Sequence, residues 1–274
     1  MCGMVNSMKY PIKSRKPRLG QHFLTSQGAL ADMVSSGKSE KGEIVLEIGP
    51  GKGVLTEKLL EQARGGGGKV VAIEKDEKLV ALLREKFAVD LQTGLFSLQE
   101  GDILDITLEN LIKPTESYRI VANIPYYITG EIIRLFLTQS HQPKSMTLLV
   151  QKEVAERIVA RDGKESILSL SVKVFGQPTY ISTVKKGSFN PPPNVDSAII
   201  HIDHIHPYEH EDAFFALVKA GFQSKRKKLI SNISGLYSKE KLSTTFARLG
   251  FDENTRAEDL KLDQWSALLA ELVQ

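Results

Sequence analysis

Cysteine is almost absent from this sequence, because Cys2 is the one cysteine among 274 residues. The chain therefore cannot form an internal disulfide framework, which suits a reducing compartment. Hydrophobic residues make up 41% of the sequence, yet none of their runs is long enough to span a bilayer. Residues 1–10 also lack the apolar core of a secretory signal. These absences predict a cytoplasmic protein without a membrane partner.

A strong excess of charge of either sign is also missing. Charged residues make up 25% of the chain, the formal net charge is +3, and the pI is about 8.7. The position of the cations therefore matters more than their sum. Residues 9–18 contain five cations and two prolines, and a second basic run consists of Lys225, Arg226, Lys227 and Lys228. Each segment is either a solvated surface or a contact for the phosphates of a nucleic acid.

Short apolar runs alternate with amphipathic stretches through most of the chain, and this alternation predicts an α/β fold. The runs that we interpret as the first four buried strands are 44–48, 70–73, 95–98 and 118–122. From Glu211 onward the pattern is helical throughout. We therefore expect three parts, which are a basic arm over 1–18, an α/β domain over 19–206, and a small C-terminal helical RNA-binding domain over 207–274.

A glycine-rich loop over residues 49–53 joins the first strand to a helix that starts near Val54. Glycines let the backbone approach a ligand closely, and the start of a helix presents free N–H groups. The spacing G-x-G-x-G matches neither the dinucleotide-binding pattern nor the P-loop. Glu47, just before the loop, would repel a phosphate but attract a cationic ligand such as S-adenosylmethionine. An ordinary turn between a strand and a helix is the alternative.

Polar residues and glycines stand at the ends of the four successive strands. Gly49 and Gly51 follow the first strand, Glu74 ends the second, Asp102 follows the third, and Asn123 follows the fourth. Ligands of open α/β sheets bind at the carboxyl ends of the strands. Glu74 is placed to hold ribose hydroxyls, and Asp102 is placed to accept a hydrogen bond from an adenine amine. Each of these residues alone is compatible with a turn or a helix cap, but together they predict one site.

The stretch from Asn123 to Tyr126 closes the fourth strand. Pro125 fixes its own φ angle and pushes Ile124 into an extended conformation. The Asn123 amide oxygen and the Ile124 carbonyl would then accept the two hydrogens of an exocyclic amine, while the Tyr126 ring stacks on the base. A tight turn with a core tyrosine is the alternative. Phe189, which precedes a run of prolines, is either a second ring facing this site or a hydrophobic plug under its own loop.

Four histidines lie close together in the sequence, at His201, His204, His206 and His210. No cysteine is near them, and strand alternation places His201 opposite His204. We therefore expect no metal site in this chain.

Several segments together resemble the ribosomal RNA adenine N6,N6-dimethyltransferase family. They are LGQHFL at 19–24, EIGPGKGVLT at 47–56, NIPY at 123–126 and FNPPPNVDSA at 189–198. The resemblance implies a Rossmann-like methyltransferase sheet with a small C-terminal helical domain, and S-adenosylmethionine as the cofactor. The implied cofactor-binding residues are His22, Leu24, Gly49, Glu74, Asp102 and Asn123. The family usually has asparagine where this chain has His22, and an imidazole would make that contact depend on pH.

The glycine loop, the Phe189 motif and the segment 222–233 are most similar to the family's bacterial small-subunit group. Enzymes of that group dimethylate two adjacent adenosines near the 3′ end of 16S rRNA during ribosome biogenesis. The resemblance therefore implies an enzyme that acts on 16S rRNA in a precursor of the small ribosomal subunit, and we expect a monomer. Three alternatives remain at this point: an erythromycin-resistance type methylase of 23S rRNA, a DNA adenine methylase, and a non-catalytic ribosome assembly factor on the same fold.

Overall fold

The computed structural model describes residues 22–38, 40–66 and 68–273. The basic arm predicted over residues 1–18, and residues 19–21 of the first motif, lie outside the described residues. None of the helices within the described ranges is long and apolar enough to cross a membrane.

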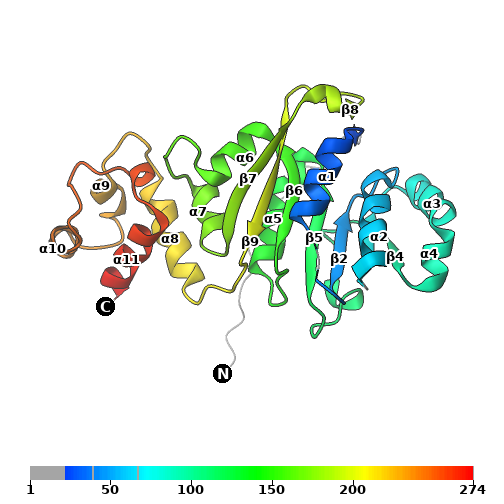
Figure 1. Ribbon diagram of the computed structural model, residues 1–274. Coiled ribbons are helices and arrows are strands. Elements are labelled where there is room, and N and C mark those ends of the chain that lie inside the picture. Colours follow the sequence, from blue (N-terminus) through cyan, green and yellow to red (C-terminus); the bar gives the residue numbers. More distant parts are fainter. Residues whose placement is uncertain (1–21, 39, 67, 274) are drawn as a thin grey trace.

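Seven strands form one sheet in the order β4-β3-β2-β5-β6-β9-β7, while β1 and β8 form a separate two-stranded sheet (Figure 1). The strands are β1 Phe23–Leu24, β2 Ile44–Ile48, β3 Lys69–Glu74, β4 Phe96–Glu100, β5 Tyr118–Asn123, β6 Met146–Gln151, β7 Gln177–Val184, β8 Phe189–Asn190 and β9 Ser197–Asp203. The first five strands of the large sheet run parallel, and β9 is antiparallel to both β6 and β7. The strand order reverses at β2, which pairs with β3 on one side and β5 on the other. Ligands of open α/β sheets bind at such a switch point.

The helices connect the parallel strands and then form the C-terminal part of the chain. The α-helices are α1 Gln27–Ser36, α2 Val54–Gly66, α3 Glu77–Lys86, α4 Ala88–Thr93, α5 Thr129–Thr138, α6 Lys152–Val159, α7 Ile167–Lys173, α8 Glu211–Gly221, α9 Leu229–Ile233, α10 Lys239–Leu249 and α11 Leu262–Val273. Short 3-10 turns are η1 Leu108–Asn110, η2 Tyr126–Ile128, η3 Lys186–Ser188 and η4 Ala257–Asp259. Ser26 caps α1 by accepting from the Ala29 N–H, and Asp76 caps α3 by accepting from the Lys78 N–H. Such side-chain oxygens satisfy N–H groups that have no partner within the helix.

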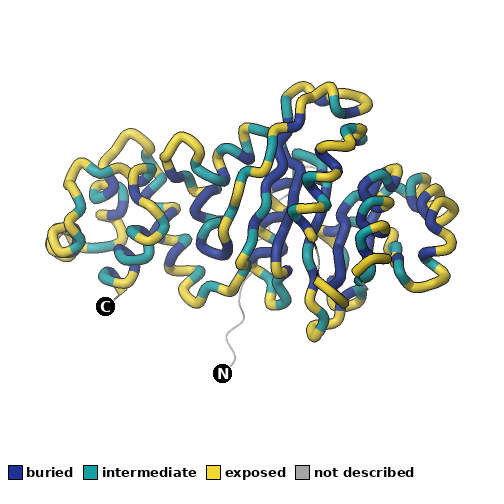
Figure 2. The backbone as a smooth tube through the Cα atoms, in the orientation of Figure 1, coloured by how far each residue is buried: buried dark blue, intermediate teal, exposed yellow. Residues whose placement is uncertain are grey.

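Hydrophobic cores cover both faces of the large sheet, because its central strands alternate their side chains between them. Leu46 of β2 belongs to the core that also holds α5, α6 and α7, whereas Val45 belongs to the core beneath α1, α2 and α3. All five residues of β2 are buried, and the central strands are the most deeply buried part of the chain (Figure 2). A parallel sheet covered in this way reads as near-continuous apolar runs, which is why its strands were recognisable in the sequence.

The β1–β8 pair joins two segments that are far apart in the chain. Phe23 pairs with Asn190 and Leu24 pairs with Phe189, and the Thr25 N–H donates to the Ser188 carbonyl at 2.8 Å. This small sheet lies at the upper edge of the molecule, close to the start of α1 (Figure 1). It brings the residues that precede α1 over the carboxyl ends of the large sheet's strands.

The C-terminal helices lie at the end of the molecule beyond α7, opposite β4 (Figure 1). Their buried residues, including Phe214 and Trp265, belong to the same core as α5 to α7. The loop before α7 adds polar links, because the Glu165 N–H donates to the Glu258 carbonyl at 2.8 Å and Lys164 pairs with the Glu258 carboxylate. The predicted α/β fold with a helical C-terminal part is confirmed.

Candidate active site

A cavity of about 550 Å³ opens where β2, β3 and β5 end, at the switch point of the sheet. Its size is typical of sites for small molecules and cofactors. Every residue that the sequence predicted for catalysis or cofactor binding lines this cavity, with the exception of Phe189. Those lining residues are His22, Leu24, Glu47, Gly49, Gly51, Glu74, Asp102, Asn123, Ile124, Pro125 and Tyr126.

Phe189 does not face the cavity. Its side chain is only 4% exposed and belongs to the core that also contains Leu24, Leu30 and Met33. Pairing with β1 turns it inward, so it is the hydrophobic plug under its loop that the sequence allowed as the alternative. The interpretation of Phe189 as a second ring facing Tyr126 is therefore wrong for this structure.

The glycine loop is held in place by the carboxylate of Glu74. The Gly51 N–H donates to Glu74 Oε2 at 3.0 Å, while Oε1 accepts from the N–H groups of Lys75 and Asp76, both at 2.9 Å. Gly51 has a φ of +59°, and a Cβ atom there would lie 3.0 Å from the Phe23 ring. A side chain at position 51 would thus meet both backbone strain and a close contact. Glu74 orders the loop, and its 5% exposed carboxylate also faces the cavity.

Glu47 is the most deeply buried acid of the site, with an exposed fraction of 1%. Its Oε2 atom has no hydrogen-bond partner among the described residues. Burial raises the pKa of Glu47 to about 8, and the negative charge of Glu74 acts in the same direction. Hydrogen bonding from Thr56 on α2 offsets only part of this burial cost, and a cationic ligand would relieve the rest. The ammonium and sulfonium of S-adenosylmethionine therefore fit this end of the cavity.

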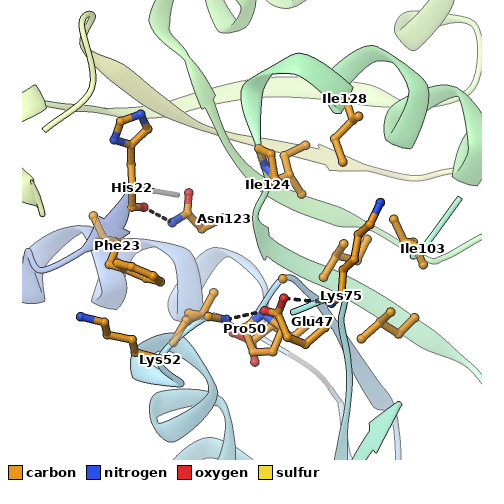
Figure 3. Close-up of a pocket in the computed structure, with 18 of the residues that line it drawn as sticks. His22, Phe23, Glu47, Pro50, Lys52, Lys75, Ile103, Asn123, Ile124 and Ile128 are labelled. Carbon is orange, nitrogen blue, oxygen red and sulfur yellow. Dashed lines mark hydrogen bonds between the residues drawn. The ribbon is translucent and has the colours of Figure 1, made fainter. Parts of the chain in front are cut away.

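Asp102 lies at the rim and pairs with Lys75, whose Nζ is 2.6 Å from Asp102 Oδ2. The other oxygen accepts from the Leu104 N–H at 3.1 Å. Partial burial opposes ionisation of Asp102, but the hydrogen bonds from Lys75 and Leu104 outweigh it and lower the pKa of this carboxyl. Asp102 is thus a charged acceptor that faces the cavity, as an adenine amine requires. Lys75 and Ile103 stand together at this end of the site (Figure 3).

The opposite corner of the site is formed by Asn123, His22 and Tyr126. The Asn123 amide nitrogen donates to the His22 carbonyl at 3.3 Å (Figure 3). The amide oxygen Oδ1 takes no part in this bond and can accept from a ligand. The Tyr126 hydroxyl shares a hydrogen bond of 2.6 Å with the Ser197 hydroxyl on β9. Burial raises the pKa of Tyr126, so its ring stays neutral. This corner presents an amide oxygen and a fixed aromatic ring side by side.

Sequence reasoning missed several residues that the structure places in the cavity lining. Lys52 lies over the Phe23 ring at 4.7 Å, and both residues contribute to the lining, as do Lys75 and Tyr127. Tyr127 is 58% exposed, which is unusual for a large aromatic side chain. Its position directly after Tyr126 was the one available signal. The position of Lys75 directly after Glu74 gave a similar hint.

The four clustered histidines do not line the cavity, and two of them make hydrogen bonds elsewhere in the structure. His201 Nδ1 lies 2.9 Å from Thr147 Oγ1, and His206 Nδ1 donates to the His204 carbonyl. Within the described ranges, no group of three or more His, Cys, Asp or Glu side chains is arranged to hold a metal ion.

The fold and the site together define a Rossmann-like methyltransferase. Comparison with known proteins supports this class and identifies the family within it. The family model described as ribosomal RNA adenine dimethylase matches residues 12–274. A ribosomal RNA small subunit methyltransferase A from Dehalococcoides mccartyi is 41% identical over 96% of this chain and 89% of its own length. The protein of the same name from Clostridium acetobutylicum is 35% identical over 96% of this chain and 95% of its own.

Solved structures agree with the assignment. A dimethyladenosine transferase from Plasmodium falciparum superposes with a TM-score of 0.75 at 28% identity, covering 91% of this chain and 97% of that one. The 23S rRNA methyltransferase ErmE superposes with a TM-score of 0.75, covering 92% of this chain and all of its own, but its 23% identity shows the shared fold alone. The chain belongs to the ribosomal RNA adenine dimethylase family. It is an enzyme that uses S-adenosylmethionine as its cofactor.

Proposed function

We propose that this enzyme dimethylates two adjacent adenosines near the 3′ end of 16S rRNA, acting as a cytoplasmic monomer on a precursor of the small ribosomal subunit. The observation that carries the proposal is the corner of Asn123 and Tyr126 at the end of β5. There an amide oxygen and a stacking ring share one cavity with the acids Glu47, Glu74 and Asp102. The names of the relatives described above support the small subunit as the source of the substrate.

An adenine amine is a poor nucleophile because its lone pair is delocalised into the ring. In our proposal Asn123 Oδ1 and the Ile124 carbonyl accept its two hydrogens, which favours a pyramidal nitrogen with a localised lone pair. The hydrogen bond from the Asn123 amide nitrogen to the His22 carbonyl fixes the orientation of the amide, with its nitrogen toward His22 and its oxygen on the other side. When bound, S-adenosylmethionine supplies an electrophilic methyl group. Positioning and fixed dipoles from these residues then account for most of the rate enhancement.

The second methylation places a further demand on the same residues. The methylated nitrogen is acidic and releases one proton to water, so after one transfer it keeps a single hydrogen and one of the two acceptors loses its contact. Asn123 belongs to β5, and Ile124 follows it directly in the chain, so the two acceptors stay in place while the nitrogen rotates about its bond to the ring. A pocket that tolerates this rotation allows two methyl groups on one base.

Replacing Tyr126 with alanine is expected to slow methyl transfer by about 5-fold to 150-fold, the equivalent of losing about 1–3 kcal/mol of base stacking. Tyr126→Phe keeps the ring and loses only the bond to Ser197, so we expect it to retain most of the rate. Single-turnover kinetics with a small-subunit substrate measures both variants. An alanine variant as fast as the wild type would exclude Tyr126 as the stacking surface.

The basic run in the loop between α8 and α9 is the proposed RNA contact outside the catalytic domain. Lys225, Arg226, Lys227 and Lys228 are all exposed, and their side chains make no ion pair with other residues in the described ranges. Asn232 fixes the loop by donating to the carbonyls of Gly221 and Ser224, at 2.6 and 3.1 Å. Four cations on an anchored loop suit a phosphate backbone.

Replacing Lys225, Lys227 and Lys228 together with glutamine is expected to weaken RNA binding and to lower the slope of log K against log salt by about 2 to 3. A matched control replaces Lys38, Lys41 and Lys113 with glutamine. These three exposed lysines precede β2 or β5, so they lie at the amino ends of the strands, opposite the edge that holds the cavity. Titration of labelled RNA at several salt concentrations compares the two triple variants. Equal slopes for both would rule out the α8–α9 loop as a specific RNA contact.

The target is tested by incubating the enzyme with undermethylated small and large ribosomal subunits and labelled cofactor. We expect label in 16S rRNA, at two adjacent adenosines. Label confined to 23S rRNA would favour the erythromycin-resistance activity. Cofactor binding without transfer to either subunit would favour a non-catalytic assembly factor.

A further inference from the structure

The target-base corner has one aromatic wall from Tyr126, while the residue expected to supply the second wall, Phe189, is buried in the core. A base that leaves its stack loses contacts on both faces. A site that offers a ring on one side only would recover part of that loss. A second ring at this corner would recover the rest.

His22 supplies such a ring. Its centroid lies 6.2 Å from that of Tyr126, and the two planes are inclined by only 22°. Both residues are half-buried and line the cavity. A flat base between two parallel rings needs about 7 Å, because each layer of contact takes about 3.5 Å. The centroid separation of 6.2 Å is an upper limit on the gap between the rings, so one ring must shift outward to admit a base.

Both rings are held by hydrogen bonds that leave their faces free. His22 Nδ1 lies 2.8 Å from the Pro191 carbonyl, and because a carbonyl only accepts, the hydrogen is on Nδ1. The Tyr126 hydroxyl is held by Ser197. The His22 carbonyl also orients the Asn123 amide, so the residue that carries the ring also directs the acceptor.

We propose that the His22 ring is the second stacking surface of the target-base site, facing Tyr126 across the extruded adenine. This inference rests on the proposed function, and it gives His22 a role toward the base beyond the cofactor contact implied by the family resemblance. Pro191 follows the buried Phe189, so the loop that removes one ring from the site fixes another ring at its edge.

The test compares His22→Leu, which removes the flat ring, with His22→Phe, which keeps a ring but loses the bond to Pro191. The probe is a short single-stranded RNA with 2-aminopurine at the target position, bound to protein saturated with S-adenosylhomocysteine. Its fluorescence changes when the base leaves the RNA stack. We expect His22→Leu to weaken probe binding by about 5-fold to 150-fold, and His22→Phe to stay within about threefold of the wild type.

Calorimetry with S-adenosylhomocysteine separates this role from cofactor binding, and thermal unfolding verifies that both variants are folded. The family resemblance also gives His22 a cofactor contact, so each variant is saturated with S-adenosylhomocysteine according to its own measured affinity before the probe is added. Wild-type probe affinity in His22→Leu, or equal losses in both variants, would overturn the proposal. The probe needs no methyl transfer, so a failure of the slot is distinct from a failure of the wild type to methylate small subunits.

Discussion

Asn123→Ala is expected to reduce methyl transfer by about a thousandfold while S-adenosylmethionine affinity stays within about tenfold of the wild type. The amide oxygen acts on the amine only as its lone pair turns toward the methyl group, so its loss falls on the chemical step. Removal of one preorganised hydrogen-bonding group from an active site commonly costs two to three powers of ten in rate. In our proposal the cofactor keeps its other contacts, because Glu47, Glu74 and Asp102 are unchanged.

Asn123→Asp refines this test. Aspartate keeps an oxygen acceptor but cannot donate to the His22 carbonyl, which lies 3.3 Å from the amide nitrogen. We expect it to be slower than the wild type and faster than alanine. Asn254→Ala, at an exposed position in the loop after α10, is the matched control. Single-turnover rates and calorimetric cofactor affinities are measured for all three variants. Near-normal turnover by Asn123→Ala would refute the proposed mechanism.

The parts of the site that the sequence revealed are those whose position depends on local order. A residue at the end of a parallel strand lies at the same sheet edge as every other such residue. Gly49, Glu74, Asp102 and Asn123 could therefore be grouped by counting strands, without knowledge of any contact. The helix caps Ser26 and Asp76 are local in the same sense, because each accepts from a backbone N–H only two or three residues further along the chain.

The parts that the sequence concealed depend on pairings between distant segments. Nothing near Phe189 shows that it pairs with Leu24, yet that pairing decides that its ring points into the core. The contact of Lys75 with Asp102 likewise joins the ends of two neighbouring strands. A ring beside prolines is compatible with a plug and with a stacking surface, and only the register of β1 with β8 separates them.

Glu47 gives the second large expected effect, which is a pH dependence of cofactor binding. The pKa of this carboxyl in the free enzyme is about 8, raised by burial, so it is protonated at neutral pH. Pairing with a cationic ligand requires the ionised form, so binding releases a proton below pH 8. We expect S-adenosylmethionine affinity to rise by up to about 50-fold between pH 6 and pH 8, because the ionised fraction of Glu47 rises about tenfold per pH unit below its pKa and reaches about one half at pH 8. Glu47→Gln should bind more weakly, without this dependence.

The same carboxyl should affect the stability of the free enzyme with the opposite sign. Between its unfolded value of 4.5 and about 8, the folded state holds a proton that the unfolded state has lost. Stability therefore falls as pH rises through this window, by at most about 5 kcal/mol. Glu47→Gln should flatten that decline, as measured by denaturant unfolding at several pH values. An unchanged decline in the variant would assign the effect to another group.

Glu43 is the control for both measurements, cofactor affinity and stability as functions of pH. It is a buried acid just before β2, but its surroundings lower its pKa, whereas those of Glu47 raise it. Burial opposes its ionisation, but hydrogen bonds from Lys144, Arg119 and the Glu40 backbone lower the pKa of Glu43 to about 2. Its stabilising effect is present above pH 4.5 and lost as pH falls toward 2. Glu43→Gln should thus destabilise the enzyme at neutral pH and leave the pH dependence of cofactor binding intact. If wild-type affinity for S-adenosylmethionine does not vary between pH 6 and pH 8, Glu47 is not the counter-charge of the cofactor.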